Sequence, residues 1–287
     1  SVFRFINTIH LLRDYQKEIV EKAIIDHRGI IEAATGTGKT RIILELVKRL
    51  SLKTLIVVPS LSILNQTKEI FLNAFGKKMV GSTSNKTERN KSIIIANYQS
   101  LDKIEDSFWN EIDCLIIDEF HHSSAKTFQN LNKKQFNKIY YRYGFTATNF
   151  RNDGSDLALQ GVLSHLIYKF SATDAIKQNY LCKPKFIFLK YSHSQQKQNT
   201  SPNAQFLLSL LKQMQNEYKV GIIENVDYNQ TVALLGAYLN KEKIPTIIFV
   251  DQIAHGETLN KLIPDSKFIN GTEKSDINAE MLKDFNN

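Results

Sequence analysis

Apolar and polar residues repeat along the chain with two different periods. Residues 11–28 place an apolar side chain every three or four positions, which predicts an amphipathic helix that Gly29 ends. The apolar positions of this helix are Leu12, Tyr15, Ile19 and Ala23. Two more helices are predicted at 40–50 and 61–75. Short, mainly apolar runs, which are typical of buried strands, lie at 30–34, 54–58, 93–96, 114–117 and 143–146.

The order of these elements predicts the fold class. Strand and helix alternate repeatedly, which is typical of an α/β fold in which helices flank both faces of a parallel sheet. Ligands of such sheets bind beyond the carboxyl ends of the strands. Functional side chains are therefore expected at those strand ends.

The second part of the chain has a weaker pattern. Residues 192–204 are polar and almost free of large apolar side chains, which indicates a linker or a mobile loop. Helices are expected near 205–217, 229–240 and 255–263, and short strands at 246–250 and 268–269. These elements predict a second α/β unit that stops early. The expected divisions are a first lobe at 1–190, a linker at 191–220 and a partial second lobe at 221–287.

Composition narrows the class of protein only slightly. The 287 residues are 42% hydrophobic and 23% charged, which is ordinary for a globular protein of about two domains. The formal net charge of +8 fits a polyanion partner such as nucleic acid and, equally well, a lysine-rich solvated surface.

The sequence shows no signal for export or membrane insertion. Its apolar runs are well short of the roughly 18 residues that span a bilayer, and the residues after Ser1 do not resemble a signal peptide. Cys114 and Cys182 have neither metal-ligand nor disulfide spacing. The expected location is the cytoplasm or the nucleoid, and a monomer is the favoured state.

A glycine-rich loop joins the strand at 30–34 to the helix at 40–50. Its residues are Thr35, Gly36, Thr37, Gly38, Lys39 and Thr40, and Ala33 stands where a phosphate-binding loop usually has its first glycine. Glycines let backbone N–H groups turn toward phosphate oxygens, and the helix adds its positive amino end. Lys39 is expected to reach the β- and γ-phosphates of ATP, and the Thr40 hydroxyl to hold Mg²⁺.

Two acidic residues follow the apolar run at 114–117. Nucleotide hydrolysis on such a loop needs a carboxylate near Mg²⁺ at the end of a neighbouring strand, and Asp118 fits this role. Glu119 is then the expected base or orienter for the attacking water. The catalytic candidates are therefore Lys39, Asp118 and Glu119. The adjacent His121 and His122 have no partners at metal-ligand spacing, so a metal site there is not favoured.

The order Asp-Glu-x-His after a phosphate loop resembles the DExH box of superfamily 2 helicases. The resemblance covers nearly the whole chain. It implies a RecA-like P-loop lobe followed by an incomplete second RecA-like lobe. It also implies that the cofactors are ATP and Mg²⁺ and that the partner is nucleic acid, with DNA favoured over RNA.

The resemblance further implies roles for residues outside the loop and the acidic pair. Gln16, in the segment Leu-Arg-Asp-Tyr-Gln, would read the adenine edge with its amide. The residues that would couple the ATP state to lobe closure are His121, Thr146 and Thr148. The implied contacts with the nucleic-acid backbone are Ser60, Gln66 and Gln99.

Two stretches narrow the resemblance to the XPB-like group of DNA helicases and to the phage UvsW type. The first comprises 118–125 and 144–154, and the second is 174–184. His255-Gly256 adds to the likeness to the UvsW type. The resemblance implies translocation on duplex or branched DNA in repair, recombination or replication. Asn149 stands where the family usually has proline, which alters the expected turn but not the fold.

Arginine is missing from the last part of the sequence. Superfamily 2 motors use second-lobe arginines to neutralise charge on the γ-phosphoryl group, but Arg151 is the last arginine here. The family's later motifs, including Gln-x-x-Gly-Arg-x-x-Arg, are absent. Either the sequence is a cut or interrupted form of a longer protein, or a partner chain supplies the arginine. The chain is expected to bind ATP·Mg²⁺ and to hydrolyse it very slowly.

Three other functions stay open at this stage. They are the motor of a restriction complex, a DExH RNA helicase, and a catalytically silent module in which nucleotide is a structural ligand. No nuclease or partner-binding region is visible for the first. The intact loop and acidic pair argue against the third, while the missing arginines argue for it.

Overall fold

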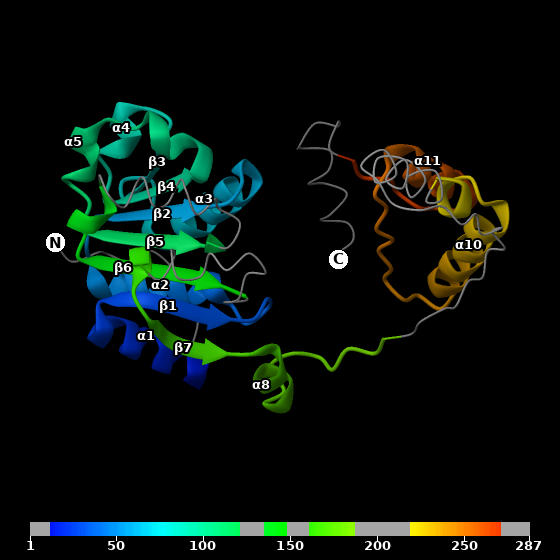
Figure 1. Ribbon diagram of the computed structural model, residues 1–287, viewed down its shortest axis with the longest axis horizontal. Coiled ribbons are helices and arrows are strands. Elements are labelled where there is room, and N and C mark those ends of the chain that lie inside the picture. Colours follow the sequence, from blue (N-terminus) through cyan, green and yellow to red (C-terminus); the bar gives the residue numbers. More distant parts are fainter. Residues whose placement is uncertain (1–11, 121–134, 148–160, 187–218, 271–287) are drawn as a thin grey trace, which may run out of the picture. The chain divides into compact units, whose positions relative to one another are not determined.

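The structure is a computed structural model that describes residues 12–120, 135–147, 161–186 and 219–270 (Figure 1). The chain divides into two compact units, Ser1–Lys185 and Phe186–Asn287. No helix of the described residues is long and apolar enough to cross a membrane.

Unit 1 is built around a seven-stranded sheet in the order β3-β4-β2-β5-β6-β1-β7. The strands are β1 (Arg28–Ala33), β2 (Thr54–Val58), β3 (Val80–Ser82), β4 (Ile93–Asn97), β5 (Cys114–Asp118), β6 (Tyr141–Thr146) and β7 (Leu166–Phe170). All six neighbouring pairs are parallel, so the arrows in Figure 1 point the same way. The predicted parallel α/β class is confirmed.

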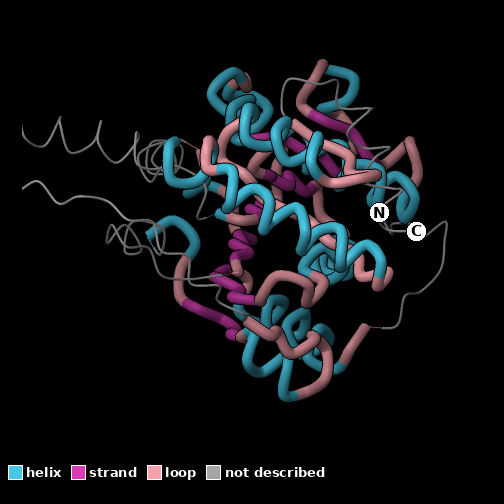
Figure 2. Tube along the Cα trace, turned by 90° about the vertical axis from the view of Figure 1, so that its right-hand side faces the viewer, coloured by secondary structure: helices cyan, strands magenta, loops and turns pink. Residues whose placement is uncertain are grey.

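Helices cover the sheet because its central strands are apolar on both faces. In β2 the side chains of Ile56 and Val58 enter one core cluster, and those of Leu55 and Val57 enter the other. The first cluster lies under α1 (Asp14–Asp26), α2 (Lys39–Leu50) and α3 (Leu61–Phe75). The second lies under short elements, namely α5 (Asp106–Trp109) and the 3₁₀ turns Tyr98–Lys103 and Phe136–Lys138, while the short helix α4 (Lys86–Arg89) has no buried residue. Figure 2 shows the strands (magenta) stacked in one sheet.

Most strands and long helices of unit 1 lie where the sequence predicts them, but one boundary is wrong. Helix α1 ends at Asp26, where His27 takes a left-handed conformation (φ 63°) as the C-cap. Gly29 lies inside β1, not at the helix end. A Cβ on Gly29 would come within 2.7 Å of the His165 carbonyl oxygen, so glycine allows the close approach of the chain next to β7.

Unit 2 contains α10 (Val226–Lys241) and α11 (Ile253–Leu262), which pack through Ala233, Leu259 and Ile263. These helices confirm two sequence predictions. The strands predicted at 246–250 and 268–269 are wrong, because neither range forms a strand and Phe249 is 90% exposed. A strand needs a hydrogen-bonded neighbour, and the described residues of unit 2 provide none.

The predicted division of the chain stays a prediction. Much of the expected linker at 191–220 and the helix expected near 205–217 lie outside the described residues. The boundary between the two compact units falls between Lys185 and Phe186 along the chain.

Candidate active site

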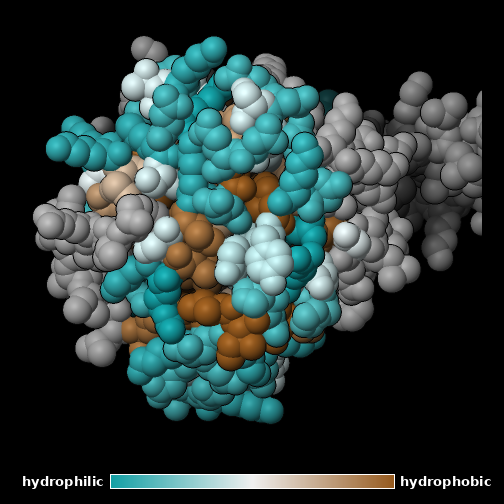
Figure 3. Space-filling model, turned by 90° about the vertical axis from the view of Figure 1, so that its left-hand side faces the viewer, coloured by the Kyte–Doolittle hydropathy of each residue, from teal (hydrophilic) through white to brown (hydrophobic). Residues whose placement is uncertain are grey.

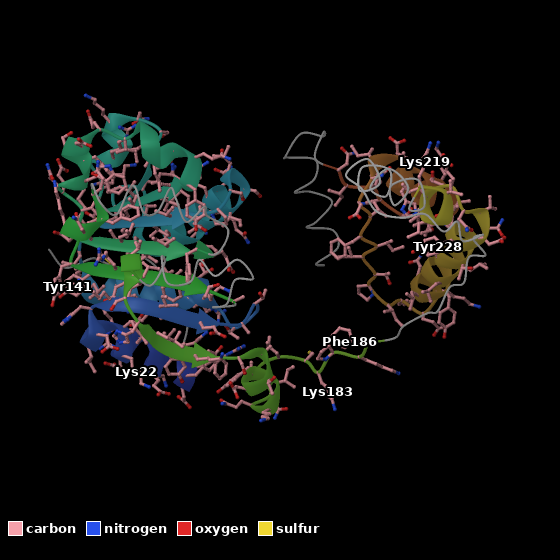
Figure 4. All side chains as sticks on the ribbon, in the orientation of Figure 1. Lys22, Tyr141, Lys183, Phe186, Lys219 and Tyr228 are labelled. Carbon is pink, nitrogen blue, oxygen red and sulfur yellow. The ribbon has the colours of Figure 1, made fainter. Side chains whose placement is uncertain are left out.

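Most of the predicted functional residues that the structure describes lie at the carboxyl edge of the sheet in unit 1. Figure 4 labels Tyr141, which begins β6 and marks the opposite, amino-terminal edge. Figure 3 looks onto that amino-terminal edge, where apolar side chains (brown) lie among polar ones (teal). The phosphate loop and the acidic pair both lie at the other edge, because β1 and β5 end there.

The glycine-rich loop connects β1 to α2, and its backbone needs its glycines. Gly36 and Gly38 have φ angles of 82° and 81°, a left-handed region that other residues enter at a cost. A Cβ on Gly38 would also lie 2.7 Å from the amide nitrogen of Gln16. Gly38 caps α2 without a side-chain bond, so the first N–H groups of a twelve-residue helix face this loop.

Thr37 holds the loop in this shape. Its buried hydroxyl donates to the Ala34 carbonyl at 2.6 Å. Its own carbonyl accepts two hydrogen bonds, one from the Tyr15 hydroxyl at 2.6 Å and one from the Gln16 amide at 2.9 Å. The start of α1 therefore fixes the loop through two side chains.

Gln16 thus has a structural contact that the sequence did not reveal. Its side chain is 1% exposed, and its amide oxygen accepts from the Arg13 backbone N–H at 3.0 Å. The hydrogen bond that Gln16 donates goes to the loop backbone. Its predicted contact with an adenine edge remains a prediction.

Tyr15, which the sequence marks as an apolar position of the first helix, also supports the phosphate loop. Its ring stacks on Phe170 of β7, with centroids 4.1 Å apart and planes 13° apart. Tyr180 tilts against the same ring at 4.9 Å, and the Arg13 guanidinium lies 4.9 Å above Tyr180. The aromatic group therefore joins the phosphate loop to the edge strand of the sheet.

The acidic pair ends β5, two strands away from β1. Asp118 is in register with Phe145 of β6, and Phe145 is in register with Ile31 of β1. This register brings the two strand ends level. The Lys39 ammonium accordingly forms an ion pair with the Glu119 carboxylate at 2.9 Å and donates to the Ala33 carbonyl at 3.3 Å.

The electrostatics of the pair favour a cation. Burial and, to a smaller extent, the neighbouring Glu119 charge together raise the pKa of Asp118 to about 6, while Lys39 and the Glu119 backbone N–H oppose the shift. Mg²⁺ prefers oxygen ligands, which the Asp118 carboxylate and the Thr40 hydroxyl supply at this edge. The donor set therefore fits the predicted Mg²⁺.

The residues predicted to couple the ATP state to lobe closure are only partly described. Thr146 ends β6, is fully buried, and lies in register with Glu32 of β1. It therefore sits between the strand that leads to the phosphate loop and the strand that carries the acidic pair. His121 and Thr148 lie outside the described residues.

The three predicted nucleic-acid contacts are all exposed, and two of them follow neighbouring strands at the carboxyl edge of the sheet. Val58 of β2 and Asn97 of β4 are in register, so Ser60 and Gln99 follow the same edge two residues later. Gln66 is exposed on α3. The Ser60 hydroxyl also caps α3, since it accepts from the Ile63 N–H at 3.3 Å.

This geometry is that of a P-loop nucleotide-binding lobe with an acidic pair beside the loop. The sequence pattern of the family described as "Type III restriction enzyme, res subunit" matches residues 9–151. Residues 9–151 thus form the helicase domain of this family, and the relatives of the chain are helicases and translocases of superfamily 2.

Individual proteins of this class share parts of the sequence. The "DNA 3'-5' translocase XPB2" of Sulfurisphaera tokodaii is 32% identical over 174 residues, which are 61% of this chain and 39% of that protein. The "ATP-dependent DNA helicase uvsW" of phage T4 is 21% identical and spans 87% of this chain and 50% of that protein. The chain covers 39–53% of the length of the first three curated relatives.

A solved structure shares the fold. The crystal structure of T4 UvsW aligns with 98% of this chain and 56% of its own, at a TM-score of 0.52 and 15% identity. At that identity the likeness concerns the fold alone. It supports the RecA-like architecture predicted from the sequence.

Proposed function

We propose that the protein is an ATP-dependent DNA helicase or translocase of superfamily 2 that acts on duplex or branched DNA in repair, recombination or replication. The observation that carries this proposal is the ion pair between Lys39 and Glu119. It joins the phosphate loop to the acidic pair at one edge of the sheet, as a nucleoside triphosphate site requires. The relatives that are called a DNA translocase and a DNA helicase support DNA as the partner.

Each residue of the site has a proposed role in binding or hydrolysing ATP. The loop from Thr35 to Thr40 turns backbone N–H groups toward the phosphates, and Lys39 binds the β- and γ-oxygens. Thr40 and Asp118 hold Mg²⁺, which neutralises phosphate charge when bound. Glu119 accepts the proton of the attacking water.

Ser60, Gln66 and Gln99 are proposed to bind the sugar–phosphate backbone. Contacts with the sugar–phosphate backbone do not depend on the base sequence. This suits a motor that must bind nucleic acid of any sequence as it moves along it. The net charge of +8 favours a polyanion over a neutral partner.

We expect hydrolysis by this 287-residue chain to be slow. No arginine follows Arg151, and an arginine that neutralises charge on the γ-phosphoryl group accelerates such reactions by about 10³–10⁵. Robust DNA-stimulated turnover by the purified chain would contradict this expectation.

The test of the proposed function is a comparison of three nucleic acids. The affinity of the chain for duplex DNA, forked DNA and RNA of equal length is measured by fluorescence anisotropy, with and without ATP·Mg²⁺. Tighter binding of duplex or forked DNA, dependent on nucleotide, is expected. A preference for RNA would favour the DExH RNA helicase instead, and no effect of nucleotide would favour a silent binding module.

The motor of a restriction complex is a second candidate, favoured by the description of the matching family. It would share the same ATP site and the same DNA preference. Its distinguishing requirement is a nuclease or a partner subunit, so DNA cleavage by the chain in a reconstituted complex would support it.

Replacing Glu119 with glutamine is expected to preserve ATP binding and to stop hydrolysis. A neutral amide cannot accept the water proton, and it no longer forms an ion pair with Lys39, which stays available for phosphate. The single-turnover hydrolysis rate should fall by at least about 100-fold, whereas the Kd for a fluorescent ATP analogue should stay equal or decrease.

Glu88→Gln is the matched control. Glu88 pairs with Lys68 and Lys91 on the surface between α3 and β4, so its loss should leave both quantities unchanged. A Glu119→Gln protein that hydrolyses ATP at the parental rate would exclude Glu119 as the base.

A further inference from the structure

Tyr98 makes a contact that none of the roles above uses. It follows β4 directly and begins the 3₁₀ turn Tyr98–Lys103. Its hydroxyl donates a hydrogen bond to the backbone carbonyl of Asp118 at 2.7 Å. Strands β4 and β5 are not neighbours, because β2 lies between them. The half-buried Tyr98 side chain therefore reaches across the end of β2 to the acidic pair.

The peptide group that Tyr98 contacts is the one between the two acidic residues. Its carbonyl, from Asp118, accepts from Tyr98, and its N–H, from Glu119, donates to the Asp118 carboxylate at 3.1 Å. Glu119 has a φ of 48°, a left-handed conformation that a non-glycine residue keeps only where its surroundings impose it. Tyr98 thus helps to orient the side chain proposed to activate water.

The same turn also carries one of the residues proposed to bind nucleic acid. Gln99, the next residue, is exposed. Ser100 fixes the turn to the ends of β4 and β3. Its hydroxyl donates to the Asn97 carbonyl at 2.8 Å and lies 3.1 Å from the Thr83 hydroxyl. A ligand bound to Gln99 would therefore shift the short turn Tyr98–Lys103. Tyr98, the first residue of this turn, donates the hydrogen bond to the Asp118 carbonyl.

We propose that Tyr98 is a positioning residue that transmits occupancy of the nucleic-acid surface at Gln99 to the Asp118–Glu119 peptide. The inference rests on the proposed function. Coupling of this kind is reciprocal, so bound DNA must change the affinity for nucleotide by the same factor as nucleotide changes the affinity for DNA. The hydroxyl of Tyr98 is the atom that carries the effect.

The test compares Tyr98→Phe with the parental chain. The Kd of a fluorescent ATP analogue with Mg²⁺ is measured with and without a forked DNA oligonucleotide. DNA should change the parental Kd by about fivefold or more. In Tyr98→Phe the Kd without DNA should stay within about twofold of the parent, and the effect of DNA should fall below about twofold.

Two further variants separate this role from simple stability. Tyr143→Phe removes another tyrosine-to-carbonyl hydrogen bond, the one to Ala23 at 2.9 Å, and should keep the parental coupling. Ser100→Ala loosens the turn without altering Tyr98 and should reduce the coupling. It also provides a test if Tyr98→Phe folds poorly in thermal unfolding.

Each outcome is decisive. A Tyr98→Phe protein with parental coupling would overturn the inference and leave the proposed function intact. A parental chain that binds both ligands without coupling would overturn it as well, because there would be no effect to transmit. A parental chain that binds no nucleotide would end the proposed function together with the inference.

Discussion

Replacing Lys39 with alanine is expected to abolish nucleotide binding at micromolar concentrations while the fold survives. Lys39 forms an ion pair with Glu119 of the acidic pair, and its ammonium also donates to the loop carbonyl of Ala33. Charged hydrogen bonds to phosphate contribute about 1.5–3 kcal/mol each, so losing one or two should weaken binding by about 10- to 10⁴-fold. Isothermal titration with ATP·Mg²⁺ measures this change.

Lys22→Ala is the matched control for the loss of one positive charge. Lys22, labelled on α1 in Figure 4, pairs with Glu18 on the surface and lies over the ring of Tyr168. Its removal should leave the nucleotide affinity unchanged. If Lys39→Ala kept the parental affinity and a parental unfolding temperature, the loop would not be a phosphate site.

Replacing Asp118 with asparagine should make the nucleotide-free protein more stable and less functional. The pKa of Asp118 is raised to about 6 from its usual 3.8, chiefly by burial, so the ionised form costs the folded state free energy above pH 6. The shift of about two units corresponds to at most about 3 kcal/mol, and solvent screening reduces this to about 1–2 kcal/mol. Chemical denaturation at pH 7.5 should show the gain in free energy of unfolding.

The pH dependence of the same residue supplies a second measurement. The pKa of Asp118 is higher in the folded state than in the unfolded state. The contribution of Asp118 to the free energy of unfolding of the parental protein should therefore rise as the pH falls from 7 to 4. Binding of ATP·Mg²⁺ should weaken about tenfold per pH unit below 6, since the cation competes with a proton. Titration of the nucleotide itself affects the parent and Asp118→Asn alike. The difference between the pH profiles of their nucleotide affinities therefore reports the titration of Asp118. Equal pH profiles in the two proteins would contradict a role for Asp118 in holding Mg²⁺.

The sequence predicts those parts of the fold that are apolar on both faces. The runs in β2, β4 and β5 are unbroken because these strands are buried on both sides, and glycine marks the loop because its backbone is left-handed. The strands β3 and β7 were not predicted. The first has three residues, and the second is an edge strand in which Phe170 alone is fully buried. Neither strand has an apolar or alternating pattern that is long enough to predict a strand from the sequence.

The sequence predicts which residues form the site, but it does not predict the contacts between them. Strand order alone places the acidic pair near the loop, but the contact between Lys39 and Glu119 depends on register. The hydroxyls of Tyr15 and Tyr98 bond to backbone carbonyls 22 and 20 residues away. Aromatic residues at core positions look alike in a sequence whether their hydroxyls bond to a catalytic loop or to nothing.

The attachment of the phosphate loop to an edge strand has a consequence for how the protein loses activity. Tyr15 bonds to the loop and stacks on Phe170 at the end of β7, and among the described strands β7 has a neighbour on one side only. Edge strands and the ends of a chain's elements open at lower free energy than central strands do. Warming should therefore fray β7 first and disorder the triphosphate cradle while the middle of the sheet is still folded, so inactivation precedes global melting.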